Sequence, residues 1–279
     1  MSSLVRIGLF AGLLGVIFAG AALAGTAIDP DVDRKSASAH SGEEETHQPR
    51  VKGLAQADDG VRLVLDPPRR VTSSGRLAFR IVDDTGATVR DFDVEHDRRM
   101  HLIVARRDLT GFQHLHPRQT ADGGWQVPMR LADAGSYRLF ADFSSAGEAH
   151  TLGVDLNVDG RFEARELPRP ATTALTAGGF EVRLKERAGE ARFTIFEDGA
   201  RVRDIEPYLG ARGHLVALRQ GDLAFLHVHP ESEATEGSDI RFSVEYPSEG
   251  SYRLFLQFKV DGRVHTAAFT REAGDVHGD

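Results

Sequence analysis

The sequence predicts an all-β protein in which two tandem immunoglobulin-like β-sandwich domains follow an N-terminal apolar helix and a flexible linker. Short runs of residues alternate between apolar and polar, as half-buried strands do. Gly, Asp, Pro and Ser bound these runs, and the same series of runs occurs twice. About seven short strands per hundred residues, with no helical stretch, are typical of an immunoglobulin-like sandwich, although a small barrel would give the same pattern.

Residues 1–28 predict a signal peptide or a transmembrane anchor. The stretch from Ile7 to Ile28 is almost free of polar residues and approaches the roughly 20 residues that span a bilayer, which favours the anchor. The triplet at residues 22–24 has instead the small-x-small form of a signal-peptidase site. Both alternatives place the remaining chain outside the cytoplasm, as a periplasmic, cell-surface or secreted protein. Residues 29–52 are polar and lack periodicity, so we expect a disordered linker there.

The composition excludes several classes of protein. The chain has 279 residues, a formal net charge of -8 and no Cys. An acidic chain offers no basic surface to a phosphate backbone, so we expect no nucleic-acid binding. A chain without Cys has no disulfides, thiolate-bound zinc, iron–sulfur clusters or thiol catalysis. Any site chemistry must therefore use His, carboxylate or hydroxyl groups.

A duplication runs through the rest of the chain, and it predicts one domain at residues 53–165 (repeat 1) and another at residues 174–272 (repeat 2). A Pro-rich join, where strand pairing must stop, separates the two. Three motifs keep their order in both repeats: FRIVDDTGATVRDFD (79–93) recurs as FTIFEDGARVRDIE (193–206), MHLIVARRDLTGFQHLHP (100–117) as GHLVALRQGDLAFLHVHP (213–230), and GSYRLFADFSSAGEAHT (135–151) as GSYRLFLQFKVDGRVHT (250–266).

Eight of the 12 histidines fall at matched positions of the two repeats. They are His101, His114, His116 and His150 in repeat 1, and His214, His227, His229 and His265 in repeat 2. In both repeats the second histidine follows the first by thirteen residues, and the third follows the second by two. Because side chains alternate along a strand, two histidines separated by one residue point to the same face.

The second motif predicts an antiparallel hairpin in each repeat, because a turn-like segment divides two strand-like runs. In repeat 1 this hairpin sets His101 opposite or diagonal to His116, with Cβ atoms about 5 to 8 Å apart. A slip of one residue in register would turn His101 to the other face. Three imidazoles on one patch could bind one ion at about 2.0 to 2.1 Å. The sequence therefore predicts one His-based metal site per repeat.

Further ligands and the kind of metal follow less directly. His150 and His265 come after the next hairpin turn and could each close a site as a fourth ligand, while Asp93 or Glu206 could supply a carboxylate or orient an imidazole. Imidazoles without thiolates favour Cu(II), Zn(II) or Ni(II), and the order of affinities favours copper. Only neutral imidazole coordinates, so we expect binding to weaken below about pH 6. A duplicated structural motif, with imidazoles hydrogen-bonded to the backbone at a strand end, is the alternative to metal binding.

The HLHP and HVHP hairpins, each followed by GSYRLF, resemble exported bacterial proteins described as heavy-metal-binding or copper-associated secreted proteins. The domains of that family carry an M-H-L-I-V segment, then D-L, then F-x-H-x-H-P. The resemblance covers most of residues 53–158 and, more loosely, residues 177–270. It implies a metal-associated role outside the cytoplasm, and it carries over to His101, His114 and His116 and, by repetition, to His214, His227 and His229. Repeat 2 departs from the pattern at Gly213, which stands where repeat 1 has Met100.

The expected function is the binding of Cu(II) or Zn(II) outside the cytoplasm for metal handling or resistance, without catalysis. A metal ion is the expected ligand, a membrane metal transporter is the partner that we consider, and the N-terminal segment is the contact with the membrane. A structural or adhesive sandwich module without metal is the first alternative. A cupin-like metal-dependent enzyme is the second, because Gly221, His227, His229 and Glu233 superficially match a cupin motif that repeat 1 lacks. The chain has no nucleophile elbow, P-loop or dinucleotide fingerprint.

Overall fold

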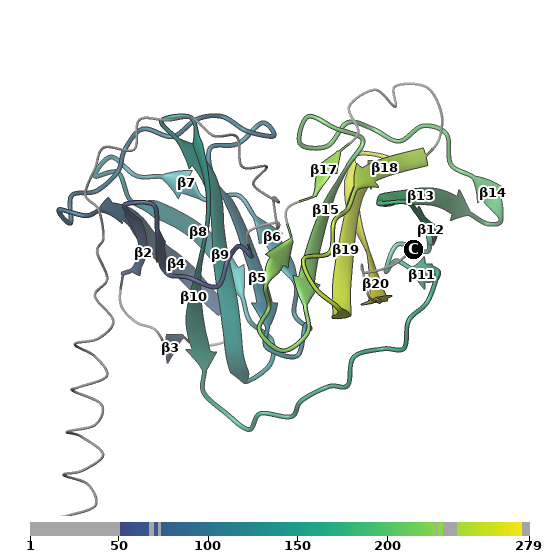
Figure 1. Ribbon diagram of the computed structural model, residues 1–279, viewed down its shortest axis with the longest axis horizontal. Helices are drawn as coiled ribbons and strands as arrows, with labels where there is room; N and C mark the ends of the chain where they lie inside the picture. Colours follow the sequence, from purple (N-terminus) through teal and green to yellow (C-terminus); the bar gives the residue numbers. More distant parts are fainter. Residues whose placement is uncertain (1–50, 67–69, 72–73, 227, 231–238, 275–279) are drawn as a thin grey trace, which may run out of the picture. The chain divides into compact units, whose positions relative to one another are not determined.

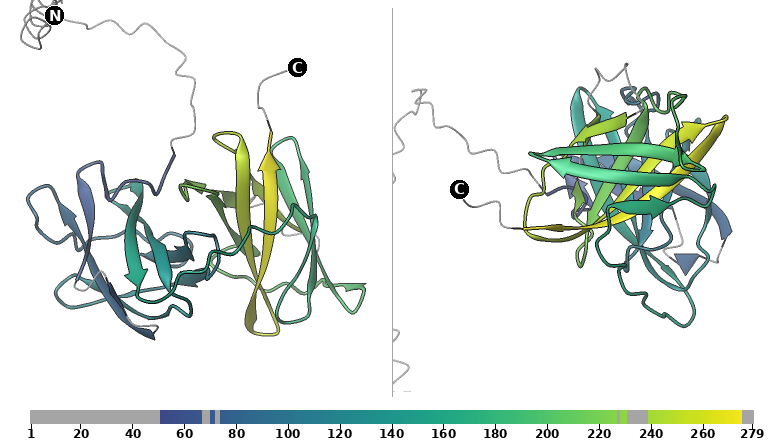
Figure 2. Two further views of the ribbon diagram at one scale, coloured as in Figure 1. Left: turned by 90° about the horizontal axis from the view of Figure 1, so that it is seen from below. Right: turned by 90° about the vertical axis from the view of Figure 1, so that its right-hand side faces the viewer.

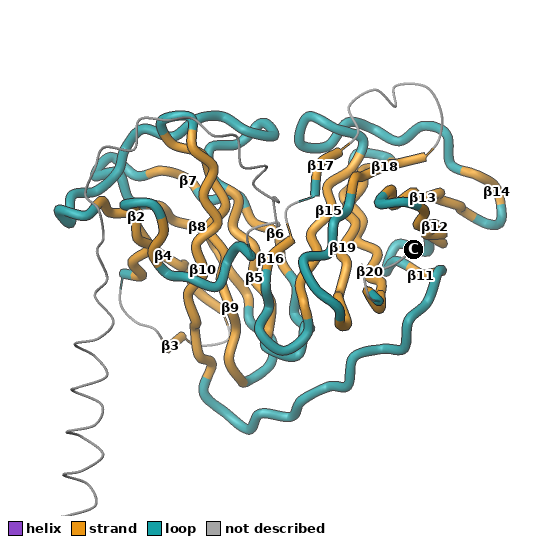
Figure 3. The backbone as a smooth tube through the Cα atoms, viewed as in Figure 1, coloured by secondary structure: helices purple, strands orange, loops and turns teal. Residues whose placement is uncertain are grey.

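The computed structural model describes residues 51–66, 70–71, 74–226, 228–230 and 239–274. Every regular element in these residues is a strand (Figure 3). The expected N-terminal segment at residues 1–28 and nearly all of the expected linker lie outside the described residues. Within the part of the chain that the structure describes, no helix has the length and apolarity that crossing a membrane requires.

Repeat 1 consists of two sheets, and all of their strands except the short β1 are labelled in Figure 1. One sheet has the order β1-β2-β4-β8-β7, and the other has the order β3-β10-β9-β5-β6. The strands are β1 (Ala57–Asp58), β2 (Val61–Leu65), β3 (Arg70–Val71), β4 (Ser74–Asp83), β5 (His101–Arg106), β6 (Gln113–Leu115), β7 (Arg118–Gln119), β8 (Trp125–Arg130), β9 (Gly135–Ser145) and β10 (Glu148–Val158).

Repeat 2 repeats this plan. Its sheets have the orders β11-β12-β13-β18-β17, with β14 paired to β13, and β16-β15-β19-β20. The β19–β20 hairpin is the long yellow pair of strands in both views of Figure 2. The strands are β11 (Thr173–Leu175), β12 (Glu181–Arg187), β13 (Glu190–Glu197), β14 (Ala200–Arg201), β15 (Gly213–Arg219), β16 (Phe225–Leu226), β17 (His229–Pro230), β18 (Asp239–Ser243), β19 (Gly250–Val260) and β20 (Arg263–Ala273).

The strand order is that of an immunoglobulin-like sandwich. An immunoglobulin domain has strands A-B-E-D in one sheet and G-F-C in the other, with C′ added beside C in variable-type domains. Repeat 1 has β2-β4-β8-β7 and β10-β9-β5-β6 in these places, and repeat 2 has β12-β13-β18-β17 and β20-β19-β15-β16. All of these neighbours pair antiparallel, and the short β3 pairs parallel with β10. The prediction of two tandem all-β sandwiches is therefore confirmed.

Both repeats also have the tyrosine corner of this fold, in which a Tyr near the start of strand F bonds back to the preceding loop. The hydroxyl of Tyr137, in β9, donates to the carbonyl of Asp133 at 2.9 Å. The hydroxyl of Tyr252, in β19, donates to the carbonyl of Ser248 at 2.9 Å. Both rings are almost fully buried. The corner fixes the entry to the central strand of the sheet that carries the histidines.

Each repeat has its own apolar core between its two sheets. Phe79, Trp125 and Leu139 belong to the core of repeat 1, and Phe193 and Leu254 to that of repeat 2. A third apolar cluster lies between the sheet of repeat 1 that contains β5 and the sheet of repeat 2 that contains β15. It joins the faces of these two sheets that point away from the cores, and we call these faces the outer faces. Its buried members are Ile103, Ala105, Leu109 and Phe140 from repeat 1, and Val216, Leu218, Leu223, Phe225 and Phe255 from repeat 2. Strand β5 is consequently buried at every position, whereas β13 alternates between buried and half-exposed positions.

The contacts across this third cluster are reciprocal. Phe112 of repeat 1 stacks on Phe255 of repeat 2, with ring centroids 4.0 Å apart. Phe225 and Phe140, which occupy the same two positions with the repeats exchanged, have centroids 5.5 Å apart. The same surface of each repeat thus meets its counterpart, as it does in a two-fold symmetric dimer.

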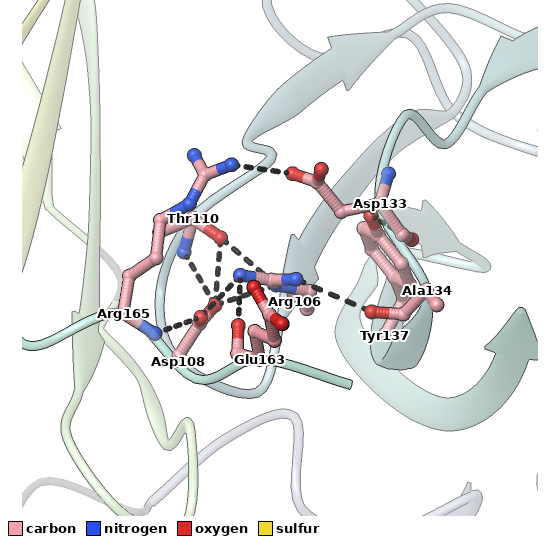
Figure 4. Close-up of polar contacts among 8 residues, drawn as sticks. All are labelled: Arg106, Asp108, Thr110, Asp133, Ala134, Tyr137, Glu163 and Arg165. Carbon is pink, nitrogen blue, oxygen red and sulfur yellow. Dashed lines mark hydrogen bonds and ion pairs between the residues drawn. The ribbon is translucent and has the colours of Figure 1, made fainter. Parts of the chain in front are cut away.

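A buried arginine fastens the segment between the repeats to repeat 1 (Figure 4). The side chain of Arg106 is 2% exposed and pairs with the carboxylate of Asp108. Arg106 also donates to the carbonyls of Ala134 and Glu163, and the backbone N–H of Arg165 donates to Asp108 at 2.9 Å. These bonds hold residues 163–165 against the hairpin that carries the first histidines.

Candidate metal centre

Three histidines meet on the outer face of the β5–β6 hairpin. In this hairpin Leu102 pairs with Leu115, and Ile103 pairs with His114. Because directly opposed residues share a face, His114 lies on the same outer face as Ile103, and the pairing continues to set His101 opposite His116. This is the register on which the sequence prediction depended. His101, His114 and His116 form the group that we call the triad.

The ligand atoms of the triad all lie within 4.8 Å of one another. Nδ1 of His101 is 3.0 Å from Nε2 of His114. The ring of His116 has its centroid 4.7 Å from that of His114 and 5.3 Å from that of His101. Two nitrogens that are each about 2.0 to 2.1 Å from one ion lie about 2.9 to 3.4 Å apart for bond angles between about 90° and 109°. The distance between His101 and His114 already falls in that range, so this group could hold a metal ion.

The outer nitrogens of two triad members face hydrogen-bond acceptors. Nε2 of His101 is 3.1 Å from the backbone carbonyl of Glu95, and Nδ1 of His114 is 2.7 Å from Oε1 of Gln257. A carbonyl oxygen can only accept, so each of these ring nitrogens carries the hydrogen and donates it. The inner nitrogens, which face each other, therefore both present lone pairs. A cation between the two nitrogens would bind both lone pairs and remove their repulsion. Metal-ligating histidines in proteins likewise donate their other ring N–H to a carbonyl or carboxylate, which fixes the tautomer.

His116 contributes the third ligand nitrogen of the triad. Its Nε2 is buried and has no hydrogen-bond partner in the described residues. An unsatisfied buried polar atom is costly unless a water or an ion meets it. The side chain of His116 also forms part of the wall of a surface pocket, together with Arg76, Arg118, Thr120, Gln126, Val127 and Pro128. His116 is thus a half-buried member of the triad that lies at a surface pocket.

Burial keeps the triad neutral. It is the main cause that holds the pKa of His114 well below the usual value, and the neighbouring imidazoles His214, His101 and His116 add to it. Burial also lowers the pKa of His101, against the opposing effects of its bond to Glu95 and of the Asp142 charge. Burial and the nearby His101 lower the pKa of His116 to about 4. Since the neutral form is the one that coordinates, burial moves the onset of proton competition below the pH of about 6 expected from the sequence.

His214 of repeat 2 lies beside the triad. Its ring centroid is 4.6 Å from that of His114, and its ring stacks on His101 at 5.8 Å with an interplanar angle of 9°. His214 pairs with Gln257, the residue that accepts the bond from His114. The sequence assigned His214 to a separate site in repeat 2. The structure brings it to the triad of repeat 1.

The structure does not bring His150 and His265 to the triad. His150 pairs with Phe143, which belongs to the core of repeat 1, and stacks on its ring at 5.2 Å. His265 pairs with Phe258, which belongs to the core of repeat 2, and stacks on it at 5.5 Å. Both histidines thus point inward, away from the outer face, and neither can be a fourth ligand at the triad.

The remaining predicted residues divide into two groups. His227 and the side chain of His229 lie outside the described residues. The carboxylates that the sequence offered as ligands bind elsewhere, because Asp93 accepts from the N–H of Gly147 and Glu206 pairs with Lys259. Both of these contacts stabilise hairpin turns.

Sequence reasoning missed His96, Asp142 and Gln257. The ring of His96 is 6.2 Å from that of His101, and His96 has no counterpart in the motif of repeat 2. Asp142 and Gln257 occupy equivalent positions in the two copies of GSYRLF and its continuation. A polar residue between apolar neighbours at the same place in both copies was the signal that could have identified Asp142 and Gln257.

The fold and the site together define a tandem immunoglobulin-like sandwich protein with a buried His triad that could hold a metal ion. The chain belongs to the family described as Domain of unknown function (DUF8832), whose sequence profile matches residues 55–160 and 174–275. One stretch lies in each repeat, which confirms the internal repeat. A search of curated proteins finds no match to the chain.

Solved structures resemble the chain only distantly. Salmonella alpha-2-macroglobulin reacted with methylamine aligns with a TM-score of 0.28 and 14% identity, over 81% of this chain and 15% of that chain. A structure of three Ig domains of titin aligns with a TM-score of 0.21 and 13% identity, over 75% and 63% of the two chains. A marsupial T cell receptor aligns with a TM-score of 0.23 and 10% identity, over 77% and 96%. The chain thus spans 15% of the macroglobulin. At these TM-scores the alignments carry no argument, and the fold assignment rests on the strand order.

Proposed function

We propose that this protein binds a transition-metal ion, Cu(II) or Zn(II), at the triad, and that it does so without catalysing a reaction. One observation carries the proposal. The outer N–H groups of His101 and His114 are held by carbonyl acceptors, and the ligand atoms of the three histidines lie within 4.8 Å of one another. Nε2 of His116 is in addition buried without a hydrogen-bond partner in the described residues. A purely structural histidine would be expected to satisfy both of its nitrogens with protein partners.

The donor set supports a divalent ion of intermediate softness. Imidazole nitrogens suit Cu(II) and Zn(II), and the chain contains no thiolate. Met100 precedes His101 but is 1% exposed and belongs to the core of repeat 1. Its thioether is therefore turned away from the triad, which argues against a Met-assisted Cu(I) site. Asp142 adds a nearby negative charge that favours a cation at His101.

We place this activity outside the cytoplasm, in metal handling or resistance. The apolar segment at residues 1–28 supports export or anchoring. The resemblance of the hairpin motif to secreted heavy-metal-binding proteins supports the metal-related role. A membrane metal transporter is the partner that we propose for delivering or receiving the ion.

Metal titration of the purified chain tests the proposal. The metal-free protein is titrated with Cu(II) and with Zn(II) in competition with a chromophoric chelator, and the bound metal is counted by elemental analysis. Replacing His114 and His116 with Ala should remove about one ion per chain. His265→Gln is the matched control, because His265 packs against Phe180 and Phe258 of repeat 2, away from the triad, and its loss should leave binding unchanged.

The His227→Ala and His229→Ala pair asks whether repeat 2 holds a second ion, and combining all four substitutions should leave no bound ion. Unchanged stoichiometry in the quadruple variant would refute the metal assignment in favour of a structural or adhesive module. Thermal unfolding gives an independent measure, because an ion that binds only the folded state at a hundredfold excess over its Kd adds about 2.7 kcal/mol of stability.

A further inference from the structure

We infer that the ion is coordinated across the two repeats, with His214 of repeat 2 as a ligand beside the triad of repeat 1. Metal binding would then clamp repeat 2 onto repeat 1. This inference rests on the proposed function and extends it from one hairpin to the contact between the repeats.

Proximity is the first argument. The ring centroid of His214 is 4.6 Å from that of His114. Within the triad, the corresponding separations are 4.7 Å for His114 and His116 and 5.2 Å for His101 and His114. His214 is thus as close to His114 as the triad members are to one another. Three imidazoles leave an open position on zinc, which takes four ligands at structural sites. We infer that His214 turns a ring nitrogen to that position when the ion binds.

The second argument is that repeat 2 already orients the triad. Gln257, in β19, accepts the hydrogen of His114 Nδ1 across the contact between the repeats. His214 is the residue opposite Gln257 on the neighbouring strand β15. One strand pair of repeat 2 therefore supplies both the acceptor that fixes the His114 tautomer and an additional imidazole. A site confined to repeat 1 would need neither.

The third argument is that the distance between the two strand pairs is set by packing. The third apolar cluster places Ile103, two residues after His101 on the same face of β5, in the same group as Val216 and Phe255. The ring of Phe112 lies flat on that of Phe255, with an interplanar angle of 6°. Since close-packed cores resist displacement, this contact holds His214 near the triad before an ion binds.

The fourth argument comes from the internal symmetry. His214 occupies in repeat 2 the position of His101 in repeat 1, and these two rings stack at 5.8 Å. Equivalent residues approach one another only near the local two-fold axis that relates the repeats. An imidazole from each repeat therefore stands where the two surfaces meet, which is the place where one ion can join both.

The test compares His214→Ala and His214→Gln with the wild-type full chain and with His265→Gln. The first readout is affinity for Zn(II) and Cu(II) by chelator competition, in which loss of His214 should weaken binding by about tenfold to a hundredfold. The second is hydrogen exchange with and without Zn(II). In the wild type, the ion should slow exchange in β15 as well as in β5. In the His214 variants it should slow exchange in β5 alone.

The outcomes separate this inference from the proposed function. If the wild type binds no ion, the proposed function fails. If the His214 variants bind within twofold of the wild type and the ion still protects β15, the inference fails while the proposed function stands. Thermal unfolding of the metal-free variants is the control that tests whether they are folded. His214→Gln keeps a polar side chain of similar length, should alanine prove too disruptive.

Discussion

The two repeats share one strand order but contribute differently to the candidate metal centre. In repeat 1 the β5–β6 hairpin brings three histidines together on its outer face. Repeat 2 offers His214 from β15 and the amide of Gln257 from β19 to that same group. Where repeat 2 has Gln257, repeat 1 has Asp142, whose charge acts on His101. Duplication thus preserved the scaffold, while equivalent positions came to serve a single site in different ways.

A second difference lies one residue before the first histidine. Met100 is buried in the core of repeat 1, whereas Gly213 takes its place in repeat 2. A Cβ atom at Gly213 would lie 2.9 Å from the carbonyl oxygen of Gln257 and 3.0 Å from the side chain of Ile240. Repeat 2 has therefore closed the space that the methionine fills in repeat 1, which explains why the motif departs there.

The largest effect should come from the arginine pairs at the equivalent hairpin turns. The side chains of Arg106 and Asp108 are 2% and 7% exposed, whereas those of Arg219 and Asp222 are 20% and 38% exposed. We expect Asp108→Asn to cost about 3 kcal/mol of unfolding free energy, because it leaves a buried guanidinium without its counter-charge. Asp222→Asn should cost less than about 1 kcal/mol. Denaturant unfolding of both variants measures this, and equal costs would contradict the contrast in burial.

Low pH should reduce the contribution of the Arg106–Asp108 pair to stability. Burial would raise the pKa of Asp108, but the bonds from Arg106, Thr110 and the N–H of Arg165 outweigh it and lower the pKa to about 2. Since the folded pKa lies below the unfolded one, this carboxylate stabilises the protein above about pH 4, and its contribution disappears as the pH falls toward 2. Asp108→Asn should lose less stability over that interval than the wild type does. Unfolding curves at pH 5 and at pH 3 test the difference.

The next largest effect is on metal affinity, and it comes from the equivalent residues Asp142 of repeat 1 and Gln257 of repeat 2. Gln257→Leu removes the acceptor that fixes the tautomer of His114, so metal affinity should fall by about tenfold to a hundredfold. Asp142→Asn removes only a nearby charge, so affinity should fall by about tenfold at most. Chelator competition measures both. A larger loss in Asp142→Asn would mean that charge, not tautomer, governs the site.

A smaller effect should be equal in the two repeats. Tyr137→Phe and Tyr252→Phe each remove the hydroxyl of a tyrosine corner, with its bond to the preceding carbonyl and one weaker bond, and should each cost about 1 kcal/mol. Thermal unfolding of the single and double variants checks this, since sites in separate domains should act additively. A double variant that costs much more than the sum would show that the two corners are energetically coupled through the shared apolar cluster.

The smallest effect should be that of mild acid on metal binding. Three solvent-exposed imidazoles with ordinary pKa values would lose about fiftyfold in affinity between pH 7.5 and pH 6 through protonation. The triad is buried, and the pKa of His116 is about 4, so it stays neutral over this interval. We therefore expect a change of less than about threefold. A loss approaching fiftyfold, measured by chelator competition at the two pH values, would show that the ligands are exposed histidines instead.

The fold and the triad were predictable because both depend on alternation along short strands. The motif HLIVARRDLTGFQHLHP contains the turn and both strands of its hairpin, so local pairing sets the register of Ile103 against His114. The faces of His150 and His265 were not predictable. In YRLFADF, consecutive positions such as Leu139 and Phe140 are both apolar, because one packs in the core and the other in the cluster between the repeats. Pattern alone does not tell which of them faces the histidines.

The approach of His214 and Gln257 to the triad could not be predicted from the sequence, for a different reason. Gln257 is 143 residues from its partner His114. No local pairing rule connects them, since their meeting depends on how one folded sandwich packs on another. The repeat itself contained a hint, because outer-face positions such as Ile103 with Val216, and Phe140 with Phe255, are apolar in both copies, which is more than a free sandwich surface requires.

The self-matching surface between the repeats also governs how the protein can be divided. Cutting the chain at the Pro-rich join would strip the cover from Phe140 and Ile103 on one half and from Phe255 and Val216 on the other. Each half would then expose an apolar patch that is complementary to the same patch on a second copy, so isolated halves would associate in solution. Anyone wishing to study a single half as a monomer must first make that patch hydrophilic.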